Sequence, residues 1–116
     1  MAKSTEPFWW LLFAAGGTVA AFLMPVHIVL GGLAPAAGGS QGALAYDRIL
    51  ALVSHPLSRI YLFGLISLSL FHWAHRFRYT LAEGLHLKTA WLPVPIACYG
   101  SAIVGTVLAA LVLARL

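Results

Sequence analysis

Three long apolar segments dominate the pattern of residues along the chain. They cover about residues 8–30, 57–75 and 91–113. A helix needs ~20 apolar residues to cross the hydrocarbon core of a bilayer, so each segment is long enough to span it. The whole chain has 116 residues, and a fourth span would leave almost no connections. The pattern predicts an all-α integral membrane protein with three transmembrane helices.

The region between the first and second spans has a different character. Residues 31–42 are rich in Gly, Ala and Pro, which is typical of a turn-forming connection. From residue 43 to 55, Asp47 and Arg48 fall on one side of a helical projection, and aliphatic residues such as Leu50 fall on the other. This pattern predicts a short helix lying in the membrane interface.

Prolines mark the predicted ends of the spans. Pro25 is expected to kink the first span, and Pro56 suits the first turn of the second. Pro93 and Pro95 fall in or before the first turn of the third. A polar loop is expected over residues 76–89, after the second span.

Composition supports a single membrane domain over residues 1–116. Hydrophobic residues make up 61% of the chain, charged residues 9%, and the mean hydropathy is +0.91, far from soluble domains. The formal charge of +4 is scattered, which favours contact with anionic lipid and gives no nucleic-acid signal. Cys98 is the only cysteine, so an internal disulfide and a cysteine-rich metal site are excluded, and we expect a buried thiol.

The distribution of basic residues predicts the orientation. The apolar run that follows Lys3 is too long for a signal peptide, so we expect an uncleaved first span. One side of the predicted topology carries Lys3, Arg76, Arg78 and Lys88, and the other carries Arg48, Arg115 and Arg59. Because cytoplasmic loops are enriched in Lys and Arg, we predict a cytoplasmic N-terminus and a C-terminus outside.

Ionisable residues gather at the end of the second span. With 100° per residue, one helical face there carries His72, His75, Arg76 and Tyr79. Arg78 and Trp73 are also explained as interfacial anchors. The histidines are harder to explain in this way, because ionisable groups at the membrane edge are costly and mark a pathway, a proton-handling site or a ligand.

Two kinds of site are compatible with these histidines. In a haem site, His27 and His72 from different spans are possible axial ligands, whereas His72 and His75 on one helix cannot clamp a haem from opposite faces. A quinone site needs hydrogen-bond donors, an aromatic wall and a group that exchanges protons near neutral pH, which suits imidazole. The aromatic start of the first span lies at the same predicted membrane surface as His75 and Arg76.

Several short motifs carry a resemblance to a known family. They are residues 6–17 (EPFWWLLFAAGG), Met24-Pro25, residues 45–50 (AYDRIL), Arg59 and His75-Arg76. In this order and at similar spacing, they resemble the D subunit, one of two hydrophobic membrane anchors, of four-subunit bacterial quinol:fumarate reductase. The resemblance extends over nearly the whole chain.

The resemblance implies a role within a complex in the bacterial inner membrane, with no catalysis by this chain alone. The implied partners are a second hydrophobic anchor (the C subunit), an iron-sulfur subunit and a flavoprotein that reduces fumarate. FAD and iron-sulfur clusters would reside only in those partners. The implied electron donor is menaquinol, oxidised at the interface between subunits during anaerobic respiration.

The resemblance also implies which residues bind the quinone: Trp10, Phe13, His75 and Arg76. The family usually has glycine after this phenylalanine, whereas this chain has Ala14. The extra methyl group is expected to change the shape of the pocket. No haem is expected in this anchor type. His27 and His72 would then be structural or proton-linked, and His86 and Lys88 would be solvated loop residues.

Three other functions are alternatives for a chain of this composition. The main alternative is a haem-b-binding anchor of a succinate:quinone oxidoreductase. A small transporter generally needs an acidic residue at mid-membrane, and none of Glu6, Asp47 and Glu83 lies there in the predicted topology. A purely structural scaffold would leave the histidines unexplained.

Overall fold

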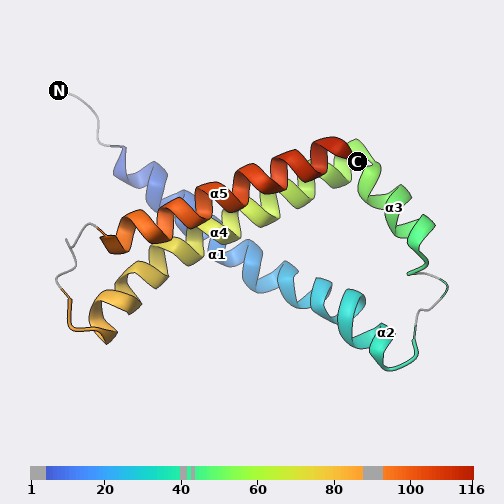
Figure 1. Cartoon of the computed structure of the whole chain (residues 1–116), viewed down its shortest axis with the longest axis horizontal. Coiled ribbons are helices and arrows are strands. Elements are labelled where there is room, and N and C mark those ends of the chain that lie inside the picture. Colours follow the sequence, from blue (N-terminus) through green and yellow to red (C-terminus); the bar gives the residue numbers. More distant parts are fainter. Residues whose placement is uncertain (1–4, 40–41, 43, 88–92) are drawn as a thin grey trace.

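The computed structural model describes residues 5–39, 42, 44–87 and 93–116 (Figure 1). The helices are α1 (Glu6–Ile28), the π-helix η1 (Val29–Leu33), α2 (Ala34–Ala36), α3 (Tyr46–Ser54), α4 (Pro56–Gly84) and α5 (Pro93–Arg115). The described residues contain no β-strand. The fold class predicted from the sequence is therefore confirmed.

Among the described residues, three stretches of helix are long and apolar enough to cross a membrane. They are Glu6–Ala36, Pro56–Gly84 and Pro93–Arg115. The shorter helix α3 lies between the first and second of them, as predicted. The beginning of α1 and the end of α5 lie toward opposite ends of the long axis in Figure 1, as an odd number of spans requires.

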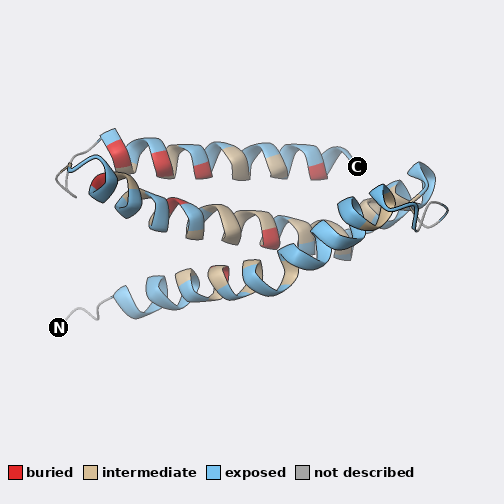
Figure 2. Cartoon of the chain, turned by 90° about the horizontal axis from the view of Figure 1, so that it is seen from below, coloured by how far each residue is buried: buried red, intermediate tan, exposed pale blue. Residues whose placement is uncertain are grey.

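Helix α4 is the centre of the bundle, because α1, α3 and α5 all pack against it. The core lies between α4 and α5, where Ala74, Val94, Cys98 and Ala102 form one buried cluster. Figure 2 shows these buried positions along the facing sides of the two helices. Since lipid tails are as apolar as leucine, such small residues hold membrane helices together by allowing close approach. Cys98 is buried and free, as expected.

Glycines allow α1 to approach α4. A Cβ atom added at Gly16 would lie 2.7 Å from the carbonyl oxygen of Leu68, and one added at Gly17 would meet the ring of His72. On α5, a Cβ at Gly105 would lie 2.8 Å from a methyl carbon of Leu70. Only glycine fits at these crossings without a shift of a neighbour.

The second span is longer than the sequence pattern predicted. Its first turn agrees with the prediction, since Pro56 follows a cap in which His55 Nδ1 accepts a hydrogen bond from the Leu57 amide at 3.2 Å. The prediction of a polar loop from Arg76 is wrong, because α4 continues to Gly84. Ala82 is buried and Leu81 packs against the α4–α5 core, so this polar-looking segment is stabilised by one apolar face.

The connection predicted over residues 31–42 also begins later than expected. The helix passes through η1, which contains Gly31 and Gly32, and ends at Ala36. In a bilayer the backbone must satisfy its own hydrogen bonds, which favours continued helix over a glycine-rich loop. The predicted start of the third span near Trp91 lies outside the described residues, and α5 begins at Pro93 with Pro95 in its first turn.

Candidate functional site

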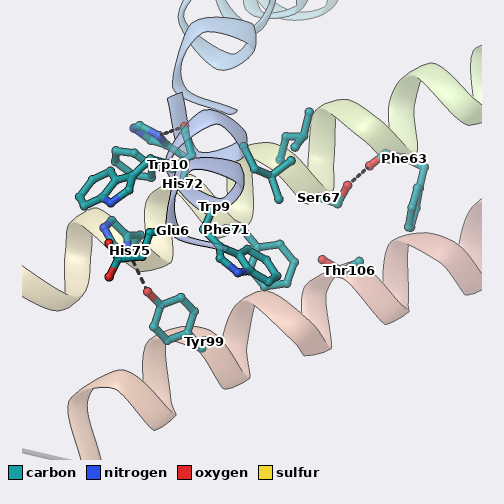
Figure 3. A pocket seen from close by; sticks show the side chains of 13 residues that line it. Glu6, Trp9, Trp10, Phe63, Ser67, Phe71, His72, His75, Tyr99 and Thr106 are labelled. Carbon is teal, nitrogen blue, oxygen red and sulfur yellow. Dashed lines mark hydrogen bonds between the residues drawn. The ribbon is translucent and has the colours of Figure 1, made fainter. Parts of the chain in front are cut away.

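A pocket of about 730 Å³ lies where α1, α4 and α5 meet (Figure 3). Its walls are mostly aromatic and aliphatic, with a few polar groups. The lining residues are Glu6, Trp9, Trp10, Leu12, Phe13, Phe63, Ser67, Leu68, Phe71, His72, His75, Tyr99 and Thr106. The volume lies within the range of ~300–1,000 Å³ that is usual for small-molecule sites.

Aromatic rings from the start of α1 meet a histidine of α4 in this pocket. The ring centroids of Trp10 and His75 are 5.7 Å apart in an edge-on arrangement, and those of Phe13 and His75 are 4.6 Å apart. Trp10 and Phe13 also contact each other edge-on at 6.1 Å. The structure thus brings together three of the four residues predicted to bind a quinone.

His75 is held by a residue of the third span that the sequence reasoning did not include. Its Nδ1 atom lies 2.8 Å from the hydroxyl oxygen of Tyr99 (Figure 3). No periodicity links Tyr99 to the histidines, because the two lie on different helices. The available signal was a tyrosine within the third span, where polar side chains are few.

His72 connects α4 to α1 where the two helices cross beside the pocket. Its ring stacks on that of Phe13, with centroids 4.3 Å apart and an interplanar angle of 13°. Its Nδ1 atom lies 3.0 Å from the carbonyl oxygen of Phe13. A carbonyl oxygen only accepts, so Nδ1 carries the hydrogen and donates it.

The other intramembrane histidine lies far along α1. His27 Nε2 is 2.8 Å from the hydroxyl of Tyr61, near the beginning of α4. Neither residue lines the 730 Å³ pocket. The two histidines considered as haem ligands thus have different partners, Tyr61 for His27 and the Phe13 carbonyl for His72.

Comparisons with known proteins agree with this architecture. The family model for the D subunit of fumarate reductase matches residues 1–114. This chain belongs to the fumarate reductase D-subunit family. It is 42% identical to the D subunit of fumarate reductase from Mycobacterium tuberculosis H37Rv over 104 residues, which covers 90% of this chain and 82% of the relative. It is 38% identical to the corresponding fumarate reductase protein of Shewanella sp. W3-18-1 over 109 residues, covering 92% and 88% of the two chains.

Membership of this family has two direct consequences. It implies a complex with other fumarate reductase subunits, and it agrees with the three candidate spans in describing a multi-pass membrane protein. It does not favour the alternative of a haem-b-binding succinate:quinone oxidoreductase anchor.

The predicted fourth site residue, Arg76, is placed differently from the other three. Arg76 is exposed and does not line the pocket formed by this fumarate reductase anchor, and its carbonyl accepts a hydrogen bond from Thr80. Arg78 is more buried. Its guanidinium lies 4.4 Å from the ring centroid of Tyr79, donates to that hydroxyl, and lies 5.7 Å from the ring centroid of Tyr99.

Ala14 and His86 both lie outside the pocket of this anchor. Ala14, which follows Phe13 where the family usually has glycine, is exposed and is not a lining residue. Its methyl group therefore does not fill the pocket within this chain. His86 is exposed just beyond α4, and Lys88 lies outside the described residues.

Proposed function

We propose that this chain is a membrane anchor of a fumarate reductase complex in the bacterial inner membrane and helps form the site where menaquinol is oxidised during anaerobic respiration. The observation that carries the proposal is the meeting of Trp10 and Phe13 from α1 with His75 from α4 around one apolar pocket. The partners are the C subunit as second anchor, the iron-sulfur subunit and, through it, the flavoprotein.

The pocket suits a flat, apolar ring system with polar oxygens. Trp10 and Phe13 offer aromatic surfaces, and His75 places an imidazole in contact with both. Menaquinol supplies two electrons and two protons on oxidation. Because Nδ1 of His75 is bonded to Tyr99, we assign Nε2 as the atom that takes a proton from a ligand hydroxyl.

Arg76 belongs to the part of the proposed site that partner subunits complete. It is adjacent to His75 on α4 and exposed in this chain, so its guanidinium is accessible to a ligand or a partner that closes the pocket. An arginine stays charged and would stabilise negative charge developing on oxygen. FAD and the iron-sulfur clusters reside in the partners, and we expect no haem.

The proposed orientation places the pocket on the cytoplasmic side. Arg76 and Arg78 lie in the C-terminal part of α4, at the pocket end, while Arg115 ends α5. The positive-inside tendency then assigns a cytoplasmic N-terminus and a periplasmic C-terminus. Reporter fusions at both termini test this orientation, and a cytoplasmic signal from the C-terminus would reverse it.

The deciding experiment replaces His75 in the whole complex. His75→Gln removes the exchangeable imidazole at nearly constant size, and general acid–base groups typically contribute about 100-fold or more to rate. We expect a loss of that order in fumarate reduction driven by 2,3-dimethyl-1,4-naphthoquinol, and none in reduction driven by a soluble dye. His27→Gln, at a residue that does not line the pocket, is the matched control and should retain both activities.

Two results would contradict the proposal. If His75→Gln keeps full quinol-driven turnover, the pocket does not handle the quinol proton. If the variant loses quinol-driven and dye-driven activity equally, the residue serves assembly. A haem b band in the reduced-minus-oxidised spectrum of the purified complex would favour the haem-binding alternative.

A further inference from the structure

We propose that Tyr99 is a positioning residue that holds His75 in the tautomer and orientation needed to accept a proton at Nε2. The inference rests on the proposed function of the pocket. It assigns a role in the quinol site to the third span, which the residues predicted from the sequence had left out.

The geometry makes Tyr99 a rigid support. Its ring packs against the α4–α5 core formed by Ala74, Val94, Cys98 and Ala102. Its hydroxyl reaches into the pocket and lies 2.8 Å from Nδ1 of His75 (Figure 3). A side chain packed against the α4–α5 core thus sets the position of the imidazole.

The tyrosine hydroxyl occupies Nδ1 of His75 and leaves Nε2 as the ring nitrogen available to a ligand. To accept a proton, Nε2 needs its lone pair, so the ring hydrogen must be on Nδ1 and be donated to the Tyr99 oxygen. During the first transfer one O–H bond of the ligand breaks and an Nε2–H bond forms, while one electron leaves to the iron-sulfur subunit. The imidazolium then releases this proton to water, and Nε2 takes the second hydroxyl proton as the second electron leaves. The Nδ1–H bond to Tyr99 is retained and stabilises the imidazolium.

Several charged and titratable groups lie around His75. On α4 they are His72, Arg78 and Tyr79, and on α1 Glu6 lines the same pocket. The Arg78 guanidinium lies against the ring faces of Tyr79 and Tyr99, and a nearby cation opposes positive charge on His75. An oxygen that accepts from Nδ1–H offsets part of this repulsion.

The test is Tyr99→Phe in the whole complex, which removes one hydroxyl and keeps the packed ring. A hydrogen bond to a charged group corresponds to about 10-fold in rate. We expect kcat with 2,3-dimethyl-1,4-naphthoquinol to fall by about this factor, with KM changed by less than about twofold, because the bond matters most as charge develops. The solvent deuterium isotope effect on kcat should increase, and dye-driven fumarate reduction should be unchanged.

The chain provides a matched control in Tyr61→Phe. It removes a tyrosine–histidine hydrogen bond of equal length, 2.8 Å to His27, on residues that do not line the pocket. It should leave kcat, KM and the isotope effect at wild-type values. If Tyr99→Phe behaves like Tyr61→Phe, or loses dye-driven activity equally, the positioning role is overturned.

A double variant separates this inference from the proposed function. In a His75→Gln background, Tyr99→Phe should have no further effect, because Tyr99 acts through His75. A further loss of about tenfold would assign Tyr99 an independent role and overturn the inference. If His75→Gln alone keeps wild-type quinol turnover, the proposed function fails; if it loses turnover while Tyr99→Phe does not, only the positioning role fails.

Discussion

The two halves of helix α4 carry the same chemical pair in different surroundings. In one half, His75 bonds to Tyr99 of α5, and in the other, Tyr61 bonds to His27 of α1, each at 2.8 Å. Only the first pair lines the 730 Å³ pocket, where rings of Trp10 and Phe13 surround the imidazole. A histidine–tyrosine bond between spans is therefore not a site in itself.

The difference lies in what the neighbouring helices contribute. Around His75, α1 supplies aromatic rings and α5 supplies a hydroxyl, so three spans converge. Around Tyr61, the nearby second pocket is smaller, about 340 Å³, and is lined by Arg59, Ile60, Phe63, Ala110, Leu113 and Ala114. Under the proposed function, these surroundings distinguish an imidazole that takes part in chemistry from one that serves packing.

Among the variants that test this difference between the two regions, Phe13→Ala is expected to have the largest effect. The ring contacts both His72 and His75, and truncating a packed phenylalanine costs about 3 kcal/mol. If this free energy is lost from ligand binding, kcat/KM for naphthoquinol drops by about 100-fold. Phe22→Ala, with a side chain that is 74% exposed and outside the pocket, is the control. Equal kcat/KM in the two variants would show that the pocket wall does not bind quinol.

A smaller effect is expected where α1 crosses α4. Gly16→Ala places a methyl group 2.7 Å from the Leu68 carbonyl oxygen, and overpacking of this kind costs about 1–3 kcal/mol. We expect a lower thermal midpoint for the complex and a weaker quinol-driven rate. Gly31→Ala has nothing within 4 Å of the added carbon and serves as the control. A Gly16→Ala complex as stable as the Gly31→Ala complex would contradict this packing.

The smallest effect is expected from Arg78→Gln. Its guanidinium lies against the rings of Tyr79 and Tyr99, and such contacts contribute about 0.5–1 kcal/mol at partly exposed sites. Quinol-driven kcat should change by about 2- to 5-fold, since the cation contacts Tyr79 and Tyr99 and influences His75 through space without bonding to it. Arg48→Gln on α3, which is exposed and far from the pocket in sequence and fold, should have no effect. A change greater than about 100-fold would make Arg78 a direct ligand.

For residues that share a helix, the sequence predicted well which side chains lie together. The spacing of His72 and His75 placed both on one face of α4, and the aromatic start of α1 was expected at the same membrane surface. The structure places Phe13 against both histidines. The prediction from sequence was weakest where burial overrides polarity, as in residues 76–84, which remain helical with Ala82 buried and Leu81 packed against the α4–α5 core.

The sequence by itself determined the number of spans, the helical class and the end of the molecule at which polar chemistry gathers. These depend on the length and periodicity of apolar runs, which are local properties. Only the tertiary structure decided that Tyr99 meets His75, that Arg76 remains outside this chain's pocket, and that Gly17 accommodates His72. Such pairings depend on the rotation and crossing of helices, which are set by the packing of residues distant in sequence.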